Sequence, residues 1–192
     1  MDRIAAGLLA CGISAGDRVL IHLDNCPELL LAWYAGARIG AVGVATNARS
    51  SADELSYFTE HAGVSCAVTQ PAFADLVTSC IAPNCWMAVT NHDGGLPADP
   101  GRQPGPAESF EALFGDPAAV PPRPVDPMAS VGIQFTSGTT SRPKGVVWTH
   151  ANALWGAQVN AAHEDLRADD VHLVYLPLFH TNAQAYSVLA AL

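Results

Sequence analysis

One stretch of the sequence reads Phe135-Thr-Ser-Gly-Thr-Thr-Ser-Arg-Pro-Lys-Gly145, and the interpretation of the whole chain starts from it. Hydroxyl side chains and glycines surround an Arg-Pro-Lys step, directly after an apolar run that begins at Val131. Backbone N–H groups, hydroxyls and a cation in one loop favour an anionic ligand, and phosphate is the obvious candidate. We therefore predict a phosphate-binding loop between strands at 131–135 and 145–148.

The loop differs from the P-loop of nucleoside triphosphatases, which has the spacing G-x-x-x-x-G-K-[ST]. Counted from Gly138, Pro143 stands where the second glycine belongs, and Gly145 stands where the hydroxyl belongs. The spacing excludes an ordinary P-loop. A polar hairpin turn that binds nothing is the other interpretation of a Ser/Thr/Gly stretch.

Short apolar runs alternate with helical patterns before this loop. We expect strands at 18–23, 41–45, 65–69 and 86–90. We expect helices at 4–11, 28–39, 51–61 and 72–80, the third opened by a capping box of Ser51 and Glu54. This alternation predicts right-handed βαβ crossovers, and hence an α/β fold whose mostly parallel sheet has flanking helices.

The whole chain, 1–192, is interpreted as one partial domain with three parts. Residues 1–90 form the α/β segment, 91–127 a Pro/Gly-rich exposed connector with one short helix at 108–114, and 128–192 the phosphate-loop segment. In the last part a second sheet element carries the loop. A helix follows at 151–166 with Trp155 among its core-facing apolar residues, then a strand at 171–176 and a helix at 183–192.

Composition excludes several classes of protein. The formal net charge of −9 gives no basic field for nucleic acid, and no apolar run is long enough for a transmembrane segment. The five cysteines are odd in number and mostly lie in apolar surroundings, which favours reduced thiols in a cytoplasmic protein. Cys80, Cys85 and His92 do not have the spacing of a usual zinc site.

The loop resembles the signature of the adenylate-forming (AMP-binding) superfamily, whose usual form is T-S-G-T-T-G-x-P-K-G. Only Ser141 departs from the commonest residue of that pattern. Leu176-Pro-Leu-Phe-His180 is similar to the next motif of the family, and Gly16-Asp-Arg-Val, Pro27-Glu and Gly40-Ala-Val match its early part. The resemblance therefore spans nearly the whole chain and is greatest to acyl-CoA synthetases and ligases.

The resemblance implies a ligase that activates a small-molecule carboxylate with ATP as acyl-AMP and transfers the acyl group to coenzyme A. It implies that the β- and γ-phosphates are bound by Thr136, Ser137, Gly138, Thr139, Thr140 and Lys144. Thr136 would also contact Mg²⁺, and Lys144 would act in catalysis by offsetting charge on pyrophosphate. His180 would lie beside the acyl carboxylate, and Arg142 is expected to face solvent. The following residues, 181–184, look most like the carnitine-type and fatty acyl-CoA ligases.

The resemblance also implies that the chain is an incomplete N-terminal domain. The family's later motifs, an acid for Mg²⁺, an aspartate for the ribose and a C-terminal lysine, do not occur in these residues. We therefore expect a fragment that is inactive alone. A nucleotide-binding pseudoenzyme module and a fragment of a carrier-loading adenylation domain remain as alternatives, and the acyl substrate and oligomeric state stay open.

Overall fold

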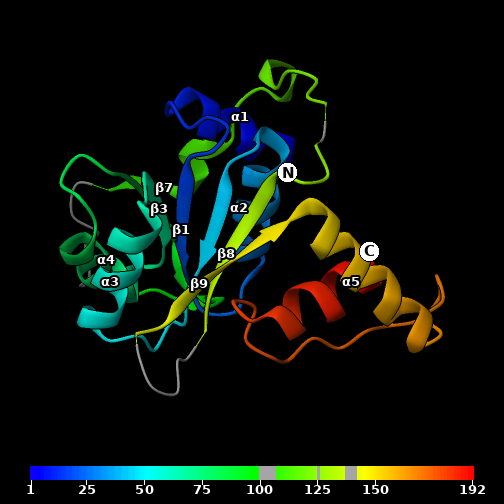
Figure 1. The fold of residues 1–192 in the computed structure, drawn as a ribbon. Helices are drawn as coiled ribbons and strands as arrows, with labels where there is room; N and C mark the ends of the chain where they lie inside the picture. The colour runs from blue at the N-terminus through cyan, green and yellow to red at the C-terminus, as the bar shows by residue number, and fades with distance from the viewer. Residues whose placement is uncertain (100–106, 125, 137–141) are drawn as a thin grey trace.

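The computed structural model of the chain describes residues 1–99, 107–124, 126–136 and 142–192. A seven-stranded sheet with the order β7-β4-β3-β1-β2-β8-β9 runs through it (Figure 1). Its strands are β1 (Arg18–His22), β2 (Val42–Ala45), β3 (Cys66–Thr69), β4 (Trp86–Val89), β7 (Glu108–Ser109), β8 (Ser130–Thr136) and β9 (Lys144–Thr149). All neighbours in the sheet pair in parallel except β8 and β9, which form an antiparallel hairpin. The predicted mostly parallel sheet is confirmed.

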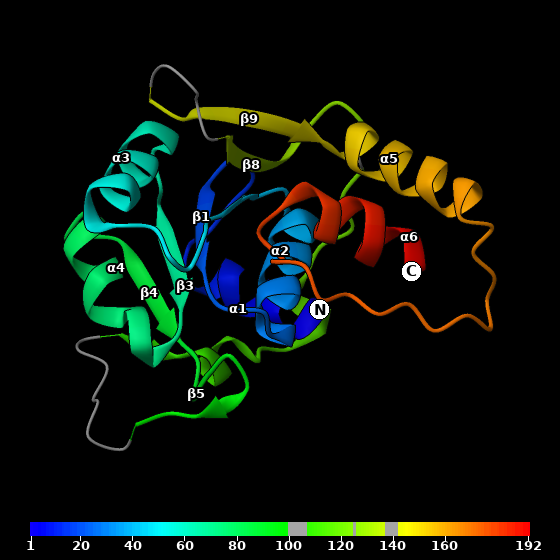
Figure 2. The ribbon, with the colours of Figure 1, turned by 90° about the horizontal axis from the view of Figure 1, so that it is seen from below.

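Helices cover both faces of this sheet, as Figure 2 shows for α1 and α2 on one side and α3 and α4 on the other. The α-helices are α1 (Asp2–Ala10), α2 (Pro27–Ile39), α3 (Ala52–Ala62), α4 (Ala74–Cys80), α5 (His150–His163) and α6 (Leu189–Ala191). Shorter turns are η1 (Pro71–Phe73), η2 (Phe110–Leu113) and η3 (Pro117–Ala119), η4 (Asn182–Val188) is a π-helix, and β5 (His92–Asp93) and β6 (Leu96–Pro97) form a separate hairpin.

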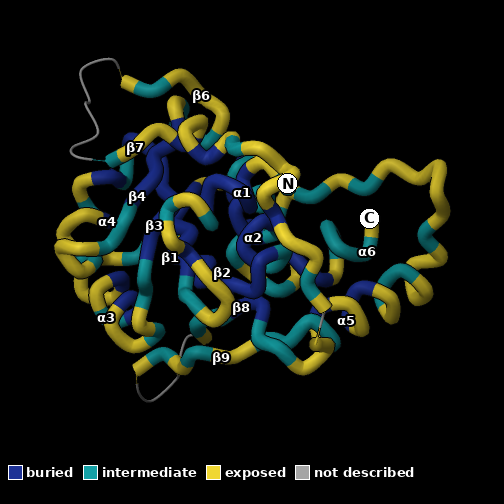
Figure 3. The backbone as a smooth tube through the Cα atoms, turned by 90° about the horizontal axis from the view of Figure 1, so that it is seen from above, coloured by how far each residue is buried: buried dark blue, intermediate teal, exposed yellow. Residues whose placement is uncertain are grey.

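Side chains of β1 alternate between two hydrophobic cores. Val19 and Ile21 pack with α1 and α2, whereas Leu20 packs with Leu55 of α3 and with Val77 of α4. Strands buried on both faces read as continuous apolar runs, which is why these runs were recognisable in the sequence. The interior strands are accordingly buried in Figure 3, while β9 and α5 are partly exposed and most residues of the segment 164–175 are exposed.

The predicted capping box at the start of α3 is present. The Ser51 hydroxyl accepts a hydrogen bond from the Glu54 N–H, the Glu54 carboxylate accepts one from the Ser51 N–H at 2.9 Å, and the helix stops at Gly63 in the left-handed conformation. A second capping box, formed by Thr149 and Asn152, starts α5. Both satisfy N–H groups that a helix start leaves unpaired.

Two parts of the predicted organisation are wrong. The strands that flank the loop do not form a second sheet element, because β8 pairs in parallel with β2 and so extends the first sheet. The segment 91–127 is not uniformly exposed either. Phe110 and Leu113 are buried against α1, and the short helix expected at 108–114 is present over a shorter range as the 3₁₀ helix η2, which the two-residue strand β7 precedes.

The expectations after β9 also need correction. Trp155 is 68% exposed, because α5 packs through its small residues Ala153, Gly156 and Ala157 instead. No strand forms at 171–176. That segment runs apart from the sheet in Figure 2, and no described strand lies beside it to pair with its backbone. The expected last helix begins as the π-helix η4.

No helix among the described residues is long and apolar enough to cross a membrane. All five cysteines belong to the described part of the chain and are free thiols. Cys26 and Cys66 are buried, and burial raises the pKa of the Cys26 thiol to about 11 and that of Cys66 to about 12. These two thiols are therefore uncharged near neutral pH and behave as apolar core residues.

Candidate functional site

A cleft of about 570 Å³ opens where β2 and β8 end. In parallel sheets ligands bind outside the carboxyl ends of the strands, so this is the expected edge. The lining residues share this edge and comprise Ala45, Thr46, Asn47, Ser50, Glu54, Phe58, Gln134, Phe135, Thr136, Pro143, Phe179, His180 and Thr181. The lining thus joins residues from both predicted motifs, although these lie far apart in the sequence.

Thr136 and Lys144 begin and end the phosphate-type loop. They are register partners at the open end of the β8–β9 hairpin, and the Thr136 hydroxyl donates to the Lys144 carbonyl at 3.5 Å. Both residues are exposed, and Lys144 is the only lysine in the sequence. The other predicted phosphate ligands, Ser137, Gly138, Thr139 and Thr140, lie outside the described residues, so their roles stay predictions.

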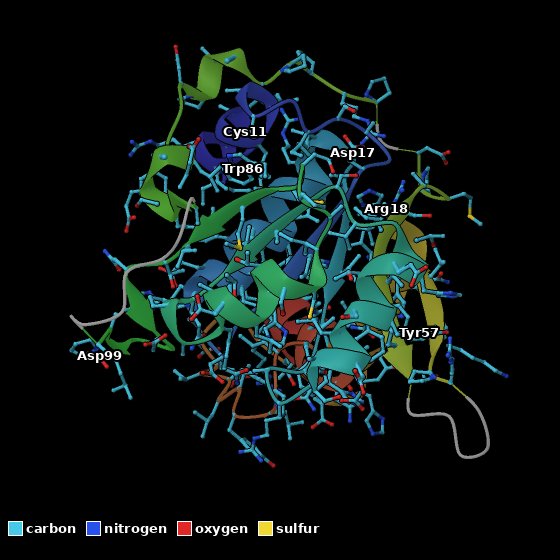
Figure 4. The ribbon with its side chains drawn as sticks, turned by 90° about the vertical axis from the view of Figure 1, so that its left-hand side faces the viewer. Cys11, Asp17, Arg18, Tyr57, Trp86 and Asp99 are labelled. Atoms are coloured by element: carbon cyan, nitrogen blue, oxygen red, sulfur yellow. The ribbon has the colours of Figure 1, made fainter. Side chains whose placement is uncertain are left out.

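Tyr57 of α3 supports the second limb of this loop. Its hydroxyl donates to the Pro143 carbonyl at 3.0 Å, and the Arg142 guanidinium carbon lies 5.3 Å from its ring centre. Figure 4 shows Tyr57 on the side of α3 next to the β8–β9 hairpin. Arg142 is exposed as expected, but it lies over an aromatic ring, and cation–π contacts of this kind stabilise exposed sites by about 0.5–1 kcal/mol.

His180 lies at a junction between a turn and the π-helix η4. Its N–H donates to the Pro177 carbonyl at 3.0 Å, and its own carbonyl accepts from the N–H groups of Ala183 and Gln184. Its side chain is exposed and lines the cleft. The structure therefore brings His180 and Thr136 to one cleft, and Lys144 adjoins Thr136.

Two amide side chains hold the segment that carries His180. The Asn25 amide donates to the Leu176 carbonyl at 2.9 Å, and its oxygen accepts from the Leu178 N–H at 2.8 Å. Gln134 of β8 donates to the Phe179 carbonyl at 3.4 Å and accepts from the Thr181 hydroxyl. Neither residue was recognisable from the sequence, because no local pattern marks an amide that binds a distant backbone.

A buried histidine lies beneath the cleft. His22 ends β1, is fully buried, and its Nδ1 lies 2.8 Å from the hydroxyl of Thr46, a cleft residue. Burial lowers the pKa of His22 to about 4, against a smaller opposing effect of Asp24. The imidazole is therefore neutral at physiological pH. The sequence marked it only as a histidine inside an apolar run.

The described residues offer Mg²⁺ little on their own. Glu54 is the acidic residue among those lining the cleft, and its carboxylate already accepts hydrogen bonds from the Ser51 N–H and hydroxyl. The Thr136 hydroxyl is a weak ligand without a carboxylate beside it. The described residues that line the cleft do not make a protein-held Mg²⁺ site, so among them the ion would have to be carried by the phosphates of a nucleotide.

A second cavity, of about 620 Å³, lies between α2 and α5 and is lined in part by Met1, Trp33, Tyr34, Arg38 and Leu192. Although it is the larger of the two, it contains none of the predicted site residues. The smaller cleft is therefore the candidate site, on the basis of its side chains and its place at the carboxyl ends of the strands.

Comparison with known proteins identifies the family of the chain. A family model described as AMP-binding enzyme matches residues 1–192, and the chain belongs to that family. It is 36% identical to the crotonobetaine/carnitine–CoA ligase of Escherichia coli strain K12, over all of the chain and 37% of that protein. The chain thus spans little more than a third of the curated relatives it matches.

Solved structures of related proteins share the fold. The apo structure of MbtA from Mycobacterium smegmatis superposes with a TM-score of 0.83 at 30% identity, over 99% of the chain and 35% of that protein. ATP-bound MatB from Rhodopseudomonas palustris gives 0.81 at 27% identity, over 99% of the chain and 36% of that protein. The resemblance seen in the motifs therefore extends to the arrangement of the whole chain.

Proposed function

We propose that this chain provides the phosphate loop and the acyl-side histidine of an ATP-dependent acyl-CoA ligase. The observation that carries the proposal is the single cleft at the ends of β2 and β8, which Thr136 and His180 line together and beside which Lys144 lies. An ATP-bound relative with the same fold and the relation to a CoA ligase support ATP and coenzyme A as co-substrates.

The proposed reaction has two steps. A carboxylate oxygen bonds to the α-phosphorus of ATP while the bond to the β-phosphate bridging oxygen breaks, which gives acyl-AMP and pyrophosphate. The thiol sulfur of coenzyme A then bonds to the acyl carbon, loses its proton to the surroundings, and AMP leaves. Mg²⁺ on the phosphates would supply charge neutralisation.

In the first step the chain's residues act by position and charge. Lys144 places a cation where negative charge accumulates on the leaving pyrophosphate, and Thr136 donates a hydroxyl hydrogen bond to a phosphate oxygen. Such preorganised donors act mainly on the transition state. A ring N–H of His180 would hydrogen-bond to the substrate carboxylate and hold it in line with the α-phosphorus.

The acyl substrate is proposed as a short polar carboxylate of the carnitine type, because that is what the curated relative is named for. Residues 181–184 favour the same branch by resemblance. Five free thiols fit a reducing compartment, and we place the protein in the cytoplasm on that ground. We expect no adenylation by the 192 residues alone, because catalytic groups of the family are not among them.

Calorimetry with Mg·ATP tests the proposal directly. Lys144→Ala should weaken binding about 10- to 100-fold, the range expected for losing a hydrogen bond to a charged group. Arg167→Ala, which removes an equal charge from an exposed pair with Asp165, is the matched control and should leave the affinity unchanged. Equal affinity in wild type and Lys144→Ala would contradict the proposed loop function.

Pyrophosphate release with carnitine and crotonobetaine tests whether the 192 residues are inactive alone. Tight, Lys144-dependent ATP binding without release by these residues agrees with the proposal. Turnover by the purified chain would contradict the expected inactivity. Absence of any Mg·ATP binding would contradict both the ligase and the nucleotide-binding module.

A further inference from the structure

The segment that carries His180 has no strand partner in the described part of the chain. The backbone at 176–178 is irregular, although the apolar pattern at 171–176 predicted a strand. An extended segment without a backbone ladder needs other partners for its N–H and C=O groups. Asn25 supplies two of them, because its side chain bonds both the Leu176 carbonyl and the Leu178 N–H.

The pattern of these two bonds is that of a parallel strand. In a parallel pair one residue bonds to the carbonyl before, and the N–H after, the residue opposite it. Here the Asn25 amide takes the place of that residue, and the residue opposite is Pro177, which has no N–H to leave unpaired. A single side-chain amide therefore anchors the segment at the point where a proline faces it.

A second amide fixes the other side of His180. Gln134 donates to the Phe179 carbonyl and to the Gln184 side-chain oxygen, and it accepts from the Thr181 hydroxyl. Asn25 lies in the bend that follows β1, and Gln134 lies within β8. The backbone before His180 is thus held by both amides, and after His180 the Thr181 hydroxyl binds Gln134.

We propose that Asn25 is a positioning residue, which sets the place of His180 relative to a carboxylate in the cleft by holding Leu176 and Leu178. This inference rests on the proposed function, because that function gives His180 its carboxylate partner. The two hydrogen bonds by which Asn25 holds the Leu176 and Leu178 backbone do not depend on it. Asn25 is exposed and packs into neither core, so its replacement removes the hold without opening a cavity.

Hydrogen exchange of backbone amides measures the hold. In Asn25→Ala the Leu178 amide should exchange about fivefold faster, as expected for the loss of about 1 kcal/mol of hydrogen bonding. In Asn25→Asp the carboxylate still accepts from Leu178 but cannot donate to Leu176, so Leu178 should stay protected to within about twofold. Asn84→Ala, at an exposed asparagine in another turn, is the control and should leave Leu178 unchanged. Amides of Val19 and Val68 in the core report whether each variant is folded.

Two binding measurements distinguish positioning from general damage. Carnitine titrated in the presence of Mg·ATP, followed by the His180 ring resonances, should bind about tenfold more weakly to Asn25→Ala. The carnitine affinity of Asn25→Asp should fall between that of the wild type and that of Asn25→Ala. Calorimetry with Mg·ATP alone should give the wild-type affinity for each variant, because Lys144 and Thr136 are untouched. A merely structural defect would weaken both ligands.

Two results would overturn the proposed role of Asn25. Unchanged Leu178 exchange in Asn25→Ala would overturn the hold, and faster exchange with unchanged carnitine affinity would overturn the positioning role. If wild-type protein binds neither ligand, the proposed function fails. The hold is then judged by exchange, and the placement of His180 by its ring resonances without ligand, which must differ between wild type and Asn25→Ala.

Discussion

His22 lies in an environment that is unusual for a histidine. It is fully buried, it lies 2.8 Å from the Thr46 hydroxyl, and burial lowers its pKa to about 4 from an ordinary 6.5. The His22 imidazole therefore takes up a proton less readily in the folded state than in the unfolded state. Its contribution to stability is complete above pH 6.5 and is lost as the pH falls towards 4.

We predict that His22→Gln removes this part of the pH dependence. The wild-type free energy of unfolding should fall by about 3 kcal/mol between pH 6.5 and pH 4 through His22 alone, in addition to changes from other groups. Glutamine keeps a polar partner for Thr46 and carries no titrating proton. Urea titrations of both proteins at pH 7, 5.5 and 4 measure the difference, and parallel pH profiles would contradict the prediction.

At the residue level the sequence indicated the candidate site residues but not the residues that hold them in place. Thr136, Lys144 and His180 belong to local motifs, so a single stretch of sequence marks each of them. Tyr57 and Asn25 act through backbone groups more than 80 residues away, with sequence separations of 86 for Tyr57 and 151 for Asn25. Nothing near either residue in the sequence encodes that partnership, so only the fold reveals it.

At the level of elements, helix starts were predictable and distant pairing was not. The capping box of Ser51 and Glu54 is a contact within one turn, and it was confirmed. The strand expected at 171–176 was wrong, because an apolar pattern states only which faces could be buried and not whether a neighbouring strand exists. The face of α5 was misassigned for a related reason, since small residues formed its contact.

Two helix glycines provide an element-level test. A Cβ added at Gly7 of α1 would lie 2.1 Å from the Leu113 carbonyl oxygen, whereas one at Gly36 of α2 would meet Ala41 at an ordinary 3.8 Å. Gly7→Ala should therefore destabilise the protein by about 1–3 kcal/mol as α1 moves away from the η2 turn.

Gly36→Ala is the matched change, because it also adds one methyl to a buried helix glycine. It should be neutral or should stabilise by up to about 1 kcal/mol through helix propensity. Thermal unfolding of the two variants gives the comparison. Equal melting temperatures would show that η2 is not tightly packed on α1, contrary to the buried Phe110 and Leu113.

At the scale of the whole molecule, the exposed apolar residues collect in α5 and in the segment after it. Trp155 is 68% exposed, Leu173 80% and Val171 97%. Large exposed apolar areas of this kind promote association. We predict that the chain self-associates at micromolar concentration and binds the dye ANS.

The double variant Trp155→Lys/Leu173→Lys should reduce both effects, with a change in unfolding free energy within about 0.5 kcal/mol, since neither side chain is in a core. Ala168→Lys adds charge at an exposed position without removing apolar surface and serves as the control. Sedimentation velocity and ANS fluorescence measure the outcome. Unaltered association in the double variant would place the contact elsewhere.

The fold class as a whole was predictable, because buried parallel strands and intervening helices each leave a periodic signal. The place of the β8–β9 hairpin was not. Its strands carry the same local signal whether they extend the first sheet or start another, and only the parallel pairing of β8 with β2 decides between them.

That pairing sets an order of events during synthesis. β1, β2, β3 and β4 all lie within the first 89 residues and pair with one another in the order β4-β3-β1-β2, so this part of the sheet is able to assemble while the ribosome is still adding later residues. β8 must then close a long loop to reach β2, which is slow compared with local pairing. The nascent protein consequently builds its scaffold before it acquires the loop, and we expect ATP to be bound only by chains in which that late strand has docked.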